Sequence, residues 1–372
     1  MRLLFVLALL GIVAAGVFEW ANAAWDGPGL PARSGNETVV MVAPHTKVRD
    51  IAQMLEQTGA LKSGIMFEFD LRLRGMADKI KAGEYAIPSG ASMHTIATIL
   101  VQGKSIQHKL TAAEGLTSDM IWKLVQKNDV LTGDAGPVPQ EGSLLPETYL
   151  FTRGETRAHL LAKMARARDA FLAEKWESRA GGLPLANQRE AIILASIVEK
   201  ETGVPGERRH VAAIFINRLK MGMRLQTDPT IIYDLTKGYP LGRGIRASEL
   251  AAATPYNTYV IAGLPPGPIC NPGKDSIAAV LDPETSNDLY FVATGHGGHA
   301  FAATIAQQDR NVAAYRAFER QHNSEEGQAP LGQAPAGQVV ASDRLENPPI
   351  AIPDAAAPKL PARHKKRASH HR

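Results

Sequence analysis

The first run of patterned apolar and polar positions predicts a small α+β module at residues 37–104. Strand, helix, strand and helix patterns follow one another at residues 38–42, 48–55, 82–88 and 92–100. The first helix repeats apolar side chains at i, i+3, i+4 and i+7, and Ser92 is a suitable N-cap for the second. A Gly- and Pro-rich stretch at residues 24–37 precedes the module and is typical of a linker. Four elements in so short a span favour a carbohydrate- or partner-binding module over a catalytic one.

The pattern then becomes mixed, which predicts an α/β domain at residues 105–321, so that the chain as a whole is expected to be α+β. Helices are expected around residues 117–127 and 156–175, and residues 141–151 are typical of a loop that leads into a strand. A further helix is expected from Asn187, its N-cap, to Gly203 at the C′ position, and Pro205 then begins the next helix. The Gly-rich residues 295–299, between two apolar runs, predict a hairpin.

The N-terminus has the pattern of an export signal. One positive charge precedes an apolar run at residues 3–18, which as a helix is about 24 Å long, slightly shorter than a bilayer core. Two interpretations of residues 1–25 stay open. One is a signal peptide cleaved at the A-x-A sequence of residues 21–23, and the other is an uncleaved transmembrane anchor with Trp20 and Trp25 at the outer interface. Both predict that the rest of the chain is exported.

The C-terminal residues 322–372 form a Pro/Ala-rich basic tail with few large apolar residues, which predicts disorder. Six basic residues and no acid at residues 355–372 exceed the net charge of the whole chain, +4, so the remainder is near neutral. This distribution disfavours a nucleic-acid-binding face and favours a solvated tail that aids solubility or contacts anionic lipid. The single cysteine, Cys270, has no partner for an intramolecular disulfide and is interpreted as structural.

One charged residue lies where the helical pattern requires an apolar one. On a helical wheel, Glu201 falls on the stripe of Leu194 and Val198, whereas Glu199 points in nearly the opposite direction. Partial burial and the negative end of the helix both disfavour a charged carboxylate, so both raise its pKa. A raised pKa is what a general acid at neutral pH requires. From the wheel alone, a glutamate at the edge of the core whose carboxylate reaches solvent remains the alternative.

Two polar segments after this helix are candidate sugar-binding elements. Gln226, Thr227 and Asp228 precede a proline in a turn that can hold sugar hydroxyl and acetamido groups, or can simply cap the next helix. Tyr256 and Asn257 place an aromatic ring beside an amide, which suits stacking on a pyranose and equally an ordinary rigid loop. The two histidines of the Gly-rich hairpin have no carboxylate or cysteine spaced to complete a metal site, so no metal is expected.

Several ordered motifs resemble one known family. They read ASIVEKET at residues 195–202, FINRL at 215–219, GMRLQTDPT at 222–230, YNTY at 256–259 and GLPPG at 263–267. Earlier matches are AGEY at residues 82–85, Glu114-Gly115, and Glu141-Gly142 followed by Pro146 and Thr148. Over residues 37–320 the chain resembles the MltG (YceG-like) family of endolytic peptidoglycan transglycosylases. It departs from the family pattern at residues 237–248 and in the basic tail.

The resemblance implies a lyase that cleaves MurNAc–GlcNAc bonds in peptidoglycan glycan strands and leaves 1,6-anhydroMurNAc ends, terminating or trimming nascent strands. The catalytic glutamate of the family corresponds to Glu201, and neither a metal nor an organic cofactor is expected. The residues expected to bind the substrate are Gln226, Thr227, Asp228, Tyr256 and Asn257. The resemblance also implies that residues 37–104 are LysM-like and that residues 105–321 are the catalytic domain. It further implies an uncleaved single-pass anchor in the bacterial inner membrane, a catalytic domain in the periplasm, and binding to peptidoglycan synthases.

Two other functions remain compatible with the sequence. A muramidase hydrolase would need a second carboxylate, such as that of Asp228, near Glu201 and would produce reducing ends. A non-catalytic peptidoglycan-binding scaffold would depend on the module at residues 37–104, and Glu201→Gln would not change its function.

Overall fold

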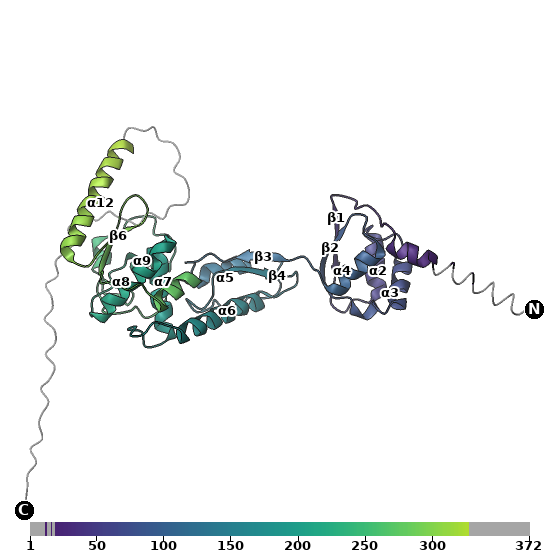
Figure 1. The fold of residues 1–372 in the computed structure, drawn as a ribbon, viewed down its shortest axis with the longest axis horizontal. Helices are drawn as coiled ribbons and strands as arrows, with labels where there is room; N and C mark the ends of the chain where they lie inside the picture. Colours follow the sequence, from purple (N-terminus) through teal and green to yellow (C-terminus); the bar gives the residue numbers. More distant parts are fainter. Residues whose placement is uncertain (1–11, 13–15, 17–18, 327–372) are drawn as a thin grey trace, which may run out of the picture.

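The computed structural model describes residues 12, 16 and 19–326, which form helices and small antiparallel sheets in two lobes (Figure 1). The mixed α+β class expected from the sequence is confirmed. The N-terminal module contains β1 (Glu37–Val42), α2 (Val48–Gln57), α3 (Gly64–Leu73), the short 3₁₀ helix η1 (Ala77–Lys79), β2 (Gly83–Pro88) and α4 (Met93–Gln102). The expected anchor at residues 1–25 lies largely outside the described residues. Within those that are described, no helix combines the length and the hydrophobicity needed to span a bilayer.

The N-terminal module folds because each of its elements has an apolar face. Strand β1 pairs antiparallel with β2, so that Val40 lies opposite Tyr85, and the helices cover the inner face of this sheet. Leu55 of α2 and Phe67 of α3 are completely buried between them. Tyr85 is also buried, and its hydroxyl donates to the carbonyl of Lys81 at 2.7 Å, which removes the cost of an unpaired polar group in the core.

Helix α3 is absent from the sequence prediction, so the observed order is strand, helix, helix, strand, helix. The reason is that its apolar residues occupy both faces. Phe67 and Leu71 are buried in the module, whereas Phe69 is exposed. An apolar residue on each side removes the periodicity by which an amphipathic helix is recognised. Its N-cap is regular, since the Ser63 hydroxyl accepts a hydrogen bond from the amide of Met66.

A single carboxylate connects the N-terminal module to the second lobe. Glu84 on β2 lies 2.6 Å from Nε2 of His108 and accepts a hydrogen bond from Nε of Arg153 at 2.9 Å. Its backbone carbonyl accepts a third hydrogen bond, from the amide of Ile106, at 2.7 Å. Burial acts to raise the pKa of Glu84, but hydrogen bonds from His108 and Arg153 outweigh it and lower the pKa. The carboxylate is therefore held ionised at the joint between the lobes.

The second lobe, residues 105–326, contains two further two-stranded antiparallel sheets, β3–β4 and β5–β6, among helices. Its first elements are β3 (His108–Thr111), α5 (Ser118–Gln126), β4 (Thr148–Phe151), α6 (Arg157–Glu177), α7 (Gln188–Glu201) and η2 (Pro205–Glu207). The remaining elements are α8 (Arg208–Lys220), α9 (Asp228–Thr236), α10 (Ala247–Leu250), α11 (Lys274–Leu281), β5 (Tyr290–Ala293), β6 (His299–Ala302) and α12 (Ile305–Glu326). The helices expected around residues 117–127 and 156–175 and the hairpin at residues 295–299 are confirmed.

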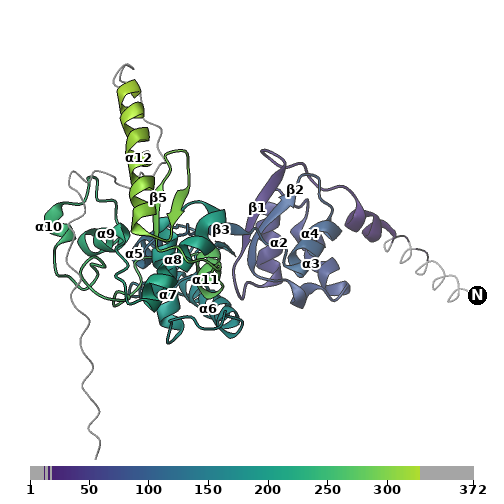
Figure 2. The same ribbon diagram turned by 60° about the vertical axis from the view of Figure 1, so that its left-hand side comes forward.

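Helix α7 lies at the centre of the second lobe. Residues 191–198 are all buried, and α8 and α11 pack beside the helix (Figure 2). Its first turn is capped as predicted, because the side chain of Asn187 accepts a hydrogen bond from the amide of Glu190 at 3.0 Å. The Glu190 carboxylate accepts in turn from the amide of Ala186 at 2.7 Å, one residue earlier than in a standard capping box. A helix fixed by burial along its length can hold its last residue rigidly.

The end of α7 differs from the prediction. Thr202 is extended (φ −135°, ψ 128°), and Gly203 does not adopt the left-handed conformation of a C′ glycine. The hydroxyl of Thr202 accepts a hydrogen bond from the amide of Val204 at 3.0 Å, which turns the chain away from the helix axis without a left-handed residue. Pro205 begins the 3₁₀ helix η2 rather than α8 itself.

The last helix of the second lobe passes the residue at which the sequence places the start of the tail. Helix α12 extends to Glu326, so the expected tail does not begin at residue 322. Residues 327–372, for which disorder is expected, lie outside the described part of the chain.

We predict that Glu84→Gln loosens the joint between the two lobes. The substitution removes the charge that accepts from Arg153 and His108, and the loss of a charge-assisted contact is worth about 1–3 kcal/mol. Limited trypsin digestion measures the effect, because the exposed Lys104 lies in the connection between the lobes. Cleavage there is expected to become severalfold faster. Glu37→Gln, on the exposed start of β1, is the matched control. Equal cleavage rates in the two variants would contradict the assignment of Glu84 as the joint.

Candidate active site

Glu201 is the last residue of α7 and is half-buried on the apolar side of that helix, as the wheel predicts. The hydroxyl of Thr227 donates a short hydrogen bond to its Oε1 atom. Glu199 on the same helix instead accepts a hydrogen bond from the amide of Gly273 at 3.0 Å. The two carboxylates therefore contact different parts of the second lobe, and only Glu201 faces the turn before α9.

The turn that carries Thr227 is fixed by other threonines. Its amide donates to the hydroxyl of Thr258 at 3.0 Å, and its carbonyl accepts from the hydroxyl of Thr230 at 2.7 Å. The preceding Gln226 has a left-handed backbone (φ 52°), a conformation that non-glycine residues seldom adopt, and its amide donates to the carbonyl of Thr258 at 3.1 Å. These bonds hold the Thr227 hydroxyl in place against Glu201.

Asp228 adds a second carboxylate next to this hydrogen bond. The hydroxyl of Tyr259 donates to its Oδ1 atom at 2.6 Å. Burial raises the pKa of Asp228, and the hydrogen bond from Tyr259 acts in the opposite direction. Burial and the neighbouring carboxylate also raise the pKa of Tyr259, so its hydroxyl remains a donor at neutral pH.

Arg218 of α8 is a buried cation beside the same site, only 7% exposed. Its Nε atom donates to the carbonyl of Leu289 at 2.6 Å, and its Nη1 atom donates to that of Leu225 at 2.7 Å. The guanidinium also lies over the ring of Tyr290, 5.4 Å from its centroid. The carbonyl groups fix the cation in position, and its charge acts on Glu201 through space.

Together these surroundings raise the pKa of Glu201 to about 7. Burial is the largest cause, and the charge of Asp228 adds to it, whereas the hydrogen bond from Thr227 and the charge of Arg218 lower the pKa. A carboxyl group with a pKa near neutrality can donate a proton to a substrate and take one up again within the same cycle. The arrangement is thus suited to acid–base chemistry at one group.

The structure brings two of the five expected substrate-binding residues, Thr227 and Asp228, to Glu201. Gln226 lies in the same turn with its side chain exposed. Tyr256 is half-buried, and its ring packs against that of Tyr233 with the centroids 5.1 Å apart.

Asn257, the fifth expected residue, is buried within its own loop. Its Nδ2 atom donates to the carbonyl groups of Glu249, Leu250 and Ala252 at 3.1, 2.9 and 2.7 Å. Its Oδ1 atom accepts from the amide of Tyr259 at 3.0 Å. The structure thus places Asn257 where it shapes the loop that presents Tyr259.

Three residues near Glu201, namely Arg218, Thr258 and Tyr259, were not among the candidates. Arg218 occupies a regular position in a helical pattern, which gives no sign that a charge there is buried. Thr258 and Tyr259 lie in the YNTY motif, but they contact residues 31 positions away in the sequence. The motif itself was the available signal, and it could not indicate which of its four side chains point toward the glutamate.

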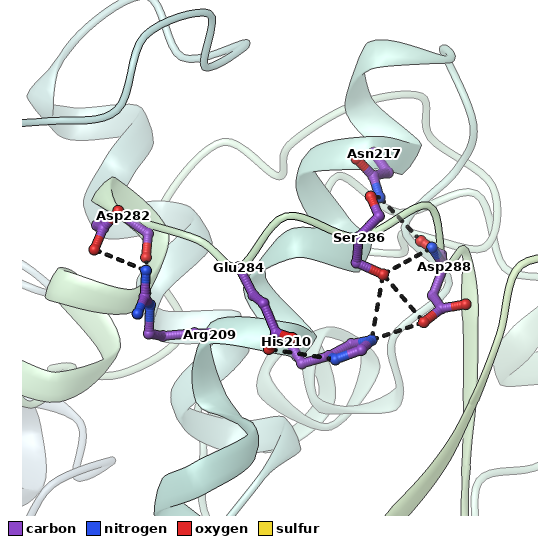
Figure 3. Close-up of polar contacts among 7 residues, drawn as sticks. All are labelled: Arg209, His210, Asn217, Asp282, Glu284, Ser286 and Asp288. Atoms are coloured by element: carbon purple, nitrogen blue, oxygen red, sulfur yellow. Dashed lines mark hydrogen bonds and ion pairs between the residues drawn. The ribbon is translucent and has the colours of Figure 1, made fainter.

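A second polar cluster connects α8 with the segment before β5 (Figure 3). Nε2 of His210 lies 2.8 Å from Oδ2 of Asp288, and Nδ1 lies 3.4 Å from Oε2 of Glu284. The Ser286 hydroxyl lies 3.4 Å from the same Nε2 atom but only 3.0 Å from Asp288. Because Asp288 occupies the nitrogen that would activate Ser286, and Phe301 stacks on the imidazole at 3.9 Å, the cluster is a structural clamp rather than a nucleophilic triad.

A hollow of about 390 Å³ lies between the end of α6, the start of α8 and α11. Its charged lining is already paired in part, as in the contact of Arg209 with Asp282 at 2.8 Å. The lining includes none of the residues around Glu201, so the hollow is separate from this site.

The sequence profile of the YceG-like family matches residues 40–314. The chain is 29% identical over 359 residues to the endolytic murein transglycosylase of Streptococcus pneumoniae (serotype 2, strain D39), covering 84% of this chain and 64% of that protein. The chain thus spans less than two thirds of that relative. It is 27% identical over 337 residues to the endolytic murein transglycosylase of Bacillus subtilis (strain 168), covering 82% of this chain and 91% of that protein. A crystal structure of a YceG-like protein from Listeria monocytogenes aligns with a TM-score of 0.46 and 28% identity, over 74% of this chain and 99% of that one.

We predict that the Glu201 carboxyl titrates near pH 7, well above the pKa of an exposed glutamate. Carbon-13 NMR of the glutamate-labelled protein measures this pKa, and the signal lost in Glu201→Gln gives the assignment. Asp228→Asn should lower the pKa, because it removes a like charge, and Thr227→Val should raise it, because it removes a donor to the ionised form. Titration of Glu201 near pH 4.5 would show that the carboxyl is solvated. Shifts in the reverse directions would contradict the effects assigned to Asp228 and Thr227.

Proposed function

Because the chain belongs to the YceG-like family, as its motifs predicted, we propose that it is an endolytic murein transglycosylase. Its substrate is the glycan strand of peptidoglycan, the bond cleaved is that between MurNAc and GlcNAc, and the new end is 1,6-anhydroMurNAc. The observation that carries the proposal is the position of the Glu201 carboxyl, half-buried at the end of α7 and held by the Thr227 hydroxyl. Terminating or trimming nascent strands is the role that follows from cleavage within a strand.

One carboxyl group suffices because the substrate supplies its own nucleophile. Protonated Glu201 donates its proton to the glycosidic oxygen as the bond between that oxygen and C1 of MurNAc breaks. The resulting carboxylate accepts the proton of the C6 hydroxyl of the same sugar, whose oxygen forms a bond with C1. Glu201 ends the cycle protonated, as it began, and no water is consumed. A pKa near 7 suits both halves of this cycle, since neither protonation state is strongly preferred.

The surroundings of Asp228 favour transglycosylation over hydrolysis. A muramidase would use a second carboxylate as a nucleophile or to activate water. In this chain the Oδ1 atom of Asp228 accepts from Tyr259, and its charge opposes the ionisation of Glu201. Burial raises the pKa of Glu201 most, Asp228 raises it further and Thr227 lowers it, while Asn257 holds the Tyr259 loop. The exposed Gln226 and the half-buried ring of Tyr256 remain as the proposed direct contacts to sugar.

The same proposal includes a place in the cell envelope. Residues 1–25 act as a single-pass anchor in the bacterial inner membrane, with the second lobe as the catalytic domain in the periplasm. The module at residues 37–104 is LysM-like and binds glycan, and peptidoglycan synthases are the partners that would deliver nascent strands. This placement is supported by the apolar run at residues 3–18 and by the order along the sequence, in which the module lies between that run and the second lobe.

We predict that Glu201→Gln abolishes cleavage of uncrosslinked peptidoglycan while the fold is retained. An amide cannot donate or accept the transferred proton, so the rate should fall by about two to four orders of magnitude. Mass spectrometry of the products identifies anhydro ends, and the melting temperature reports the fold. Glu199→Gln, the same change on the opposite side of α7, is the control and should retain most of the activity if it folds. Reducing ends in place of anhydro ends would indicate a hydrolase, and full activity of Glu201→Gln would refute the assignment.

A further inference from the structure

Helix α3 has an apolar face that no described part of the chain covers. Ile65, Phe69 and Leu73 are 81%, 63% and 61% exposed. They recur every four residues, so they form one stripe along the helix. Scattered exposed apolar residues are common on proteins, but an aligned stripe with a central aromatic ring is typical of an interaction surface.

Loose packing of the helix does not explain this exposure. The opposite face of α3 is closely packed, since Phe67 and Leu71 are completely buried in the module core. Ser63 caps the first turn, so the helix is fixed at its start. The stripe is therefore held outward by a rigid element.

The C-terminal end of α3 is attached to the helix through which the chain enters the module. Residues 19–26 are helical, and the side chain of Asn22 accepts a hydrogen bond from Nη2 of Arg74 at 2.7 Å. The Arg74 guanidinium lies over the ring of Trp25 at 4.6 Å, and Trp25 packs on Phe67 with the centroids 6.2 Å apart. The apolar run at residues 3–18 precedes this helix directly in the sequence, so the Leu73 end of the stripe lies next to the proposed point of membrane entry.

The two faces of the module point in different directions. Both ribbon views show α2, α3 and α4 on the side from which the N-terminal helix leaves, and β1 and β2 on the side facing the second lobe (Figures 1 and 2). Val39 on β1 is also exposed, at 51%, but it belongs to the outer face of the sheet. The module thus presents an apolar helix on one side and a sheet on the other.

We propose that the stripe of Ile65, Phe69 and Leu73 is a lipid-contact surface, and that α3 lies along the outer face of the bilayer in which the apolar run at residues 3–18 is anchored. The proposal rests on the membrane anchoring included in the proposed function. An aromatic and branched aliphatic face is the kind that enters the boundary between headgroups and acyl chains. Lys62, immediately before α3, is exposed and can contact an anionic headgroup, whereas Arg72 is paired with Glu68 at 2.6 Å and Arg74 lies over Trp25. In this position β1, β2 and the second lobe point away from the membrane.

A fluorescent label on the stripe tests the contact in the full-length chain. The only native cysteine, Cys270, is buried, so an introduced cysteine reacts selectively. Phe69→Cys and, as a second stripe position, Leu73→Cys are labelled with bimane, and Val39→Cys is the matched control on the sheet face. Each protein is reconstituted in vesicles of phosphatidylethanolamine and phosphatidylglycerol, with and without brominated acyl chains. Flotation with the vesicles and an unchanged melting temperature are checked for each variant.

The labels at positions 69 and 73 are expected to lose about half of their emission to the brominated lipid, whereas the label at position 39 keeps nearly all of it. Quenching at neither face, or equal quenching at both, overturns the proposal. A disulfide between two copies of the unlabelled Phe69→Cys protein, together with no quenching of the labelled protein, also overturns it and assigns the stripe to a dimer. Failure to float overturns the membrane contact alone, because cleavage of soluble glycan by the same samples tests the proposed function separately.

Discussion

The removal of one carboxyl group from water is the constraint on which the arrangement of the second lobe depends. Glu201 stands at the end of a helix whose residues 191–198 are all buried, and its direct hydrogen bond comes from Thr227. The hydrogen bond from Thr227 and the charge of Arg218 offset only part of the effect of burial, so the pKa of the carboxyl stays near neutral pH. A salt bridge at the same position would stabilise the carboxylate and would remove the acid.

The elements around Glu201 are organised so that this balance persists. Arg218 is close enough to lower the pKa of Glu201, yet its donors are directed at the carbonyl groups of Leu225 and Leu289. Asp228 acts in the opposite direction from the start of α9. Two opposing charges set by separate helices allow the pKa to be adjusted without moving the carboxyl group itself.

The sequence could predict the elements that depend on local periodicity and the residue that violates it. Glu201 was found because a charge on an apolar stripe is visible within one helix. Arg218 and Tyr259 could not be found in this way, since each acts through partners distant in the sequence. Asn257 shows the converse case, because a polar side chain in a motif is equally suited to sugar binding and to satisfying three carbonyl groups of its own loop. Helix α3 was missed because a second apolar face, exposed at Phe69, cancels the pattern that the buried face alone would have produced.

The contacts of Glu84 have a mechanical consequence for the proposed function. The module cannot rotate about the connection at residues 103–107 without separating this carboxylate from both His108 and Arg153. If the joint is stiff, the distance between the bilayer and Glu201 is nearly constant. A flexible joint would allow a wide range of distances. For an enzyme that cuts strands extending from the membrane, the width of the product-length distribution would then measure the flexibility of one joint rather than any preference of the residues that contact the sugar.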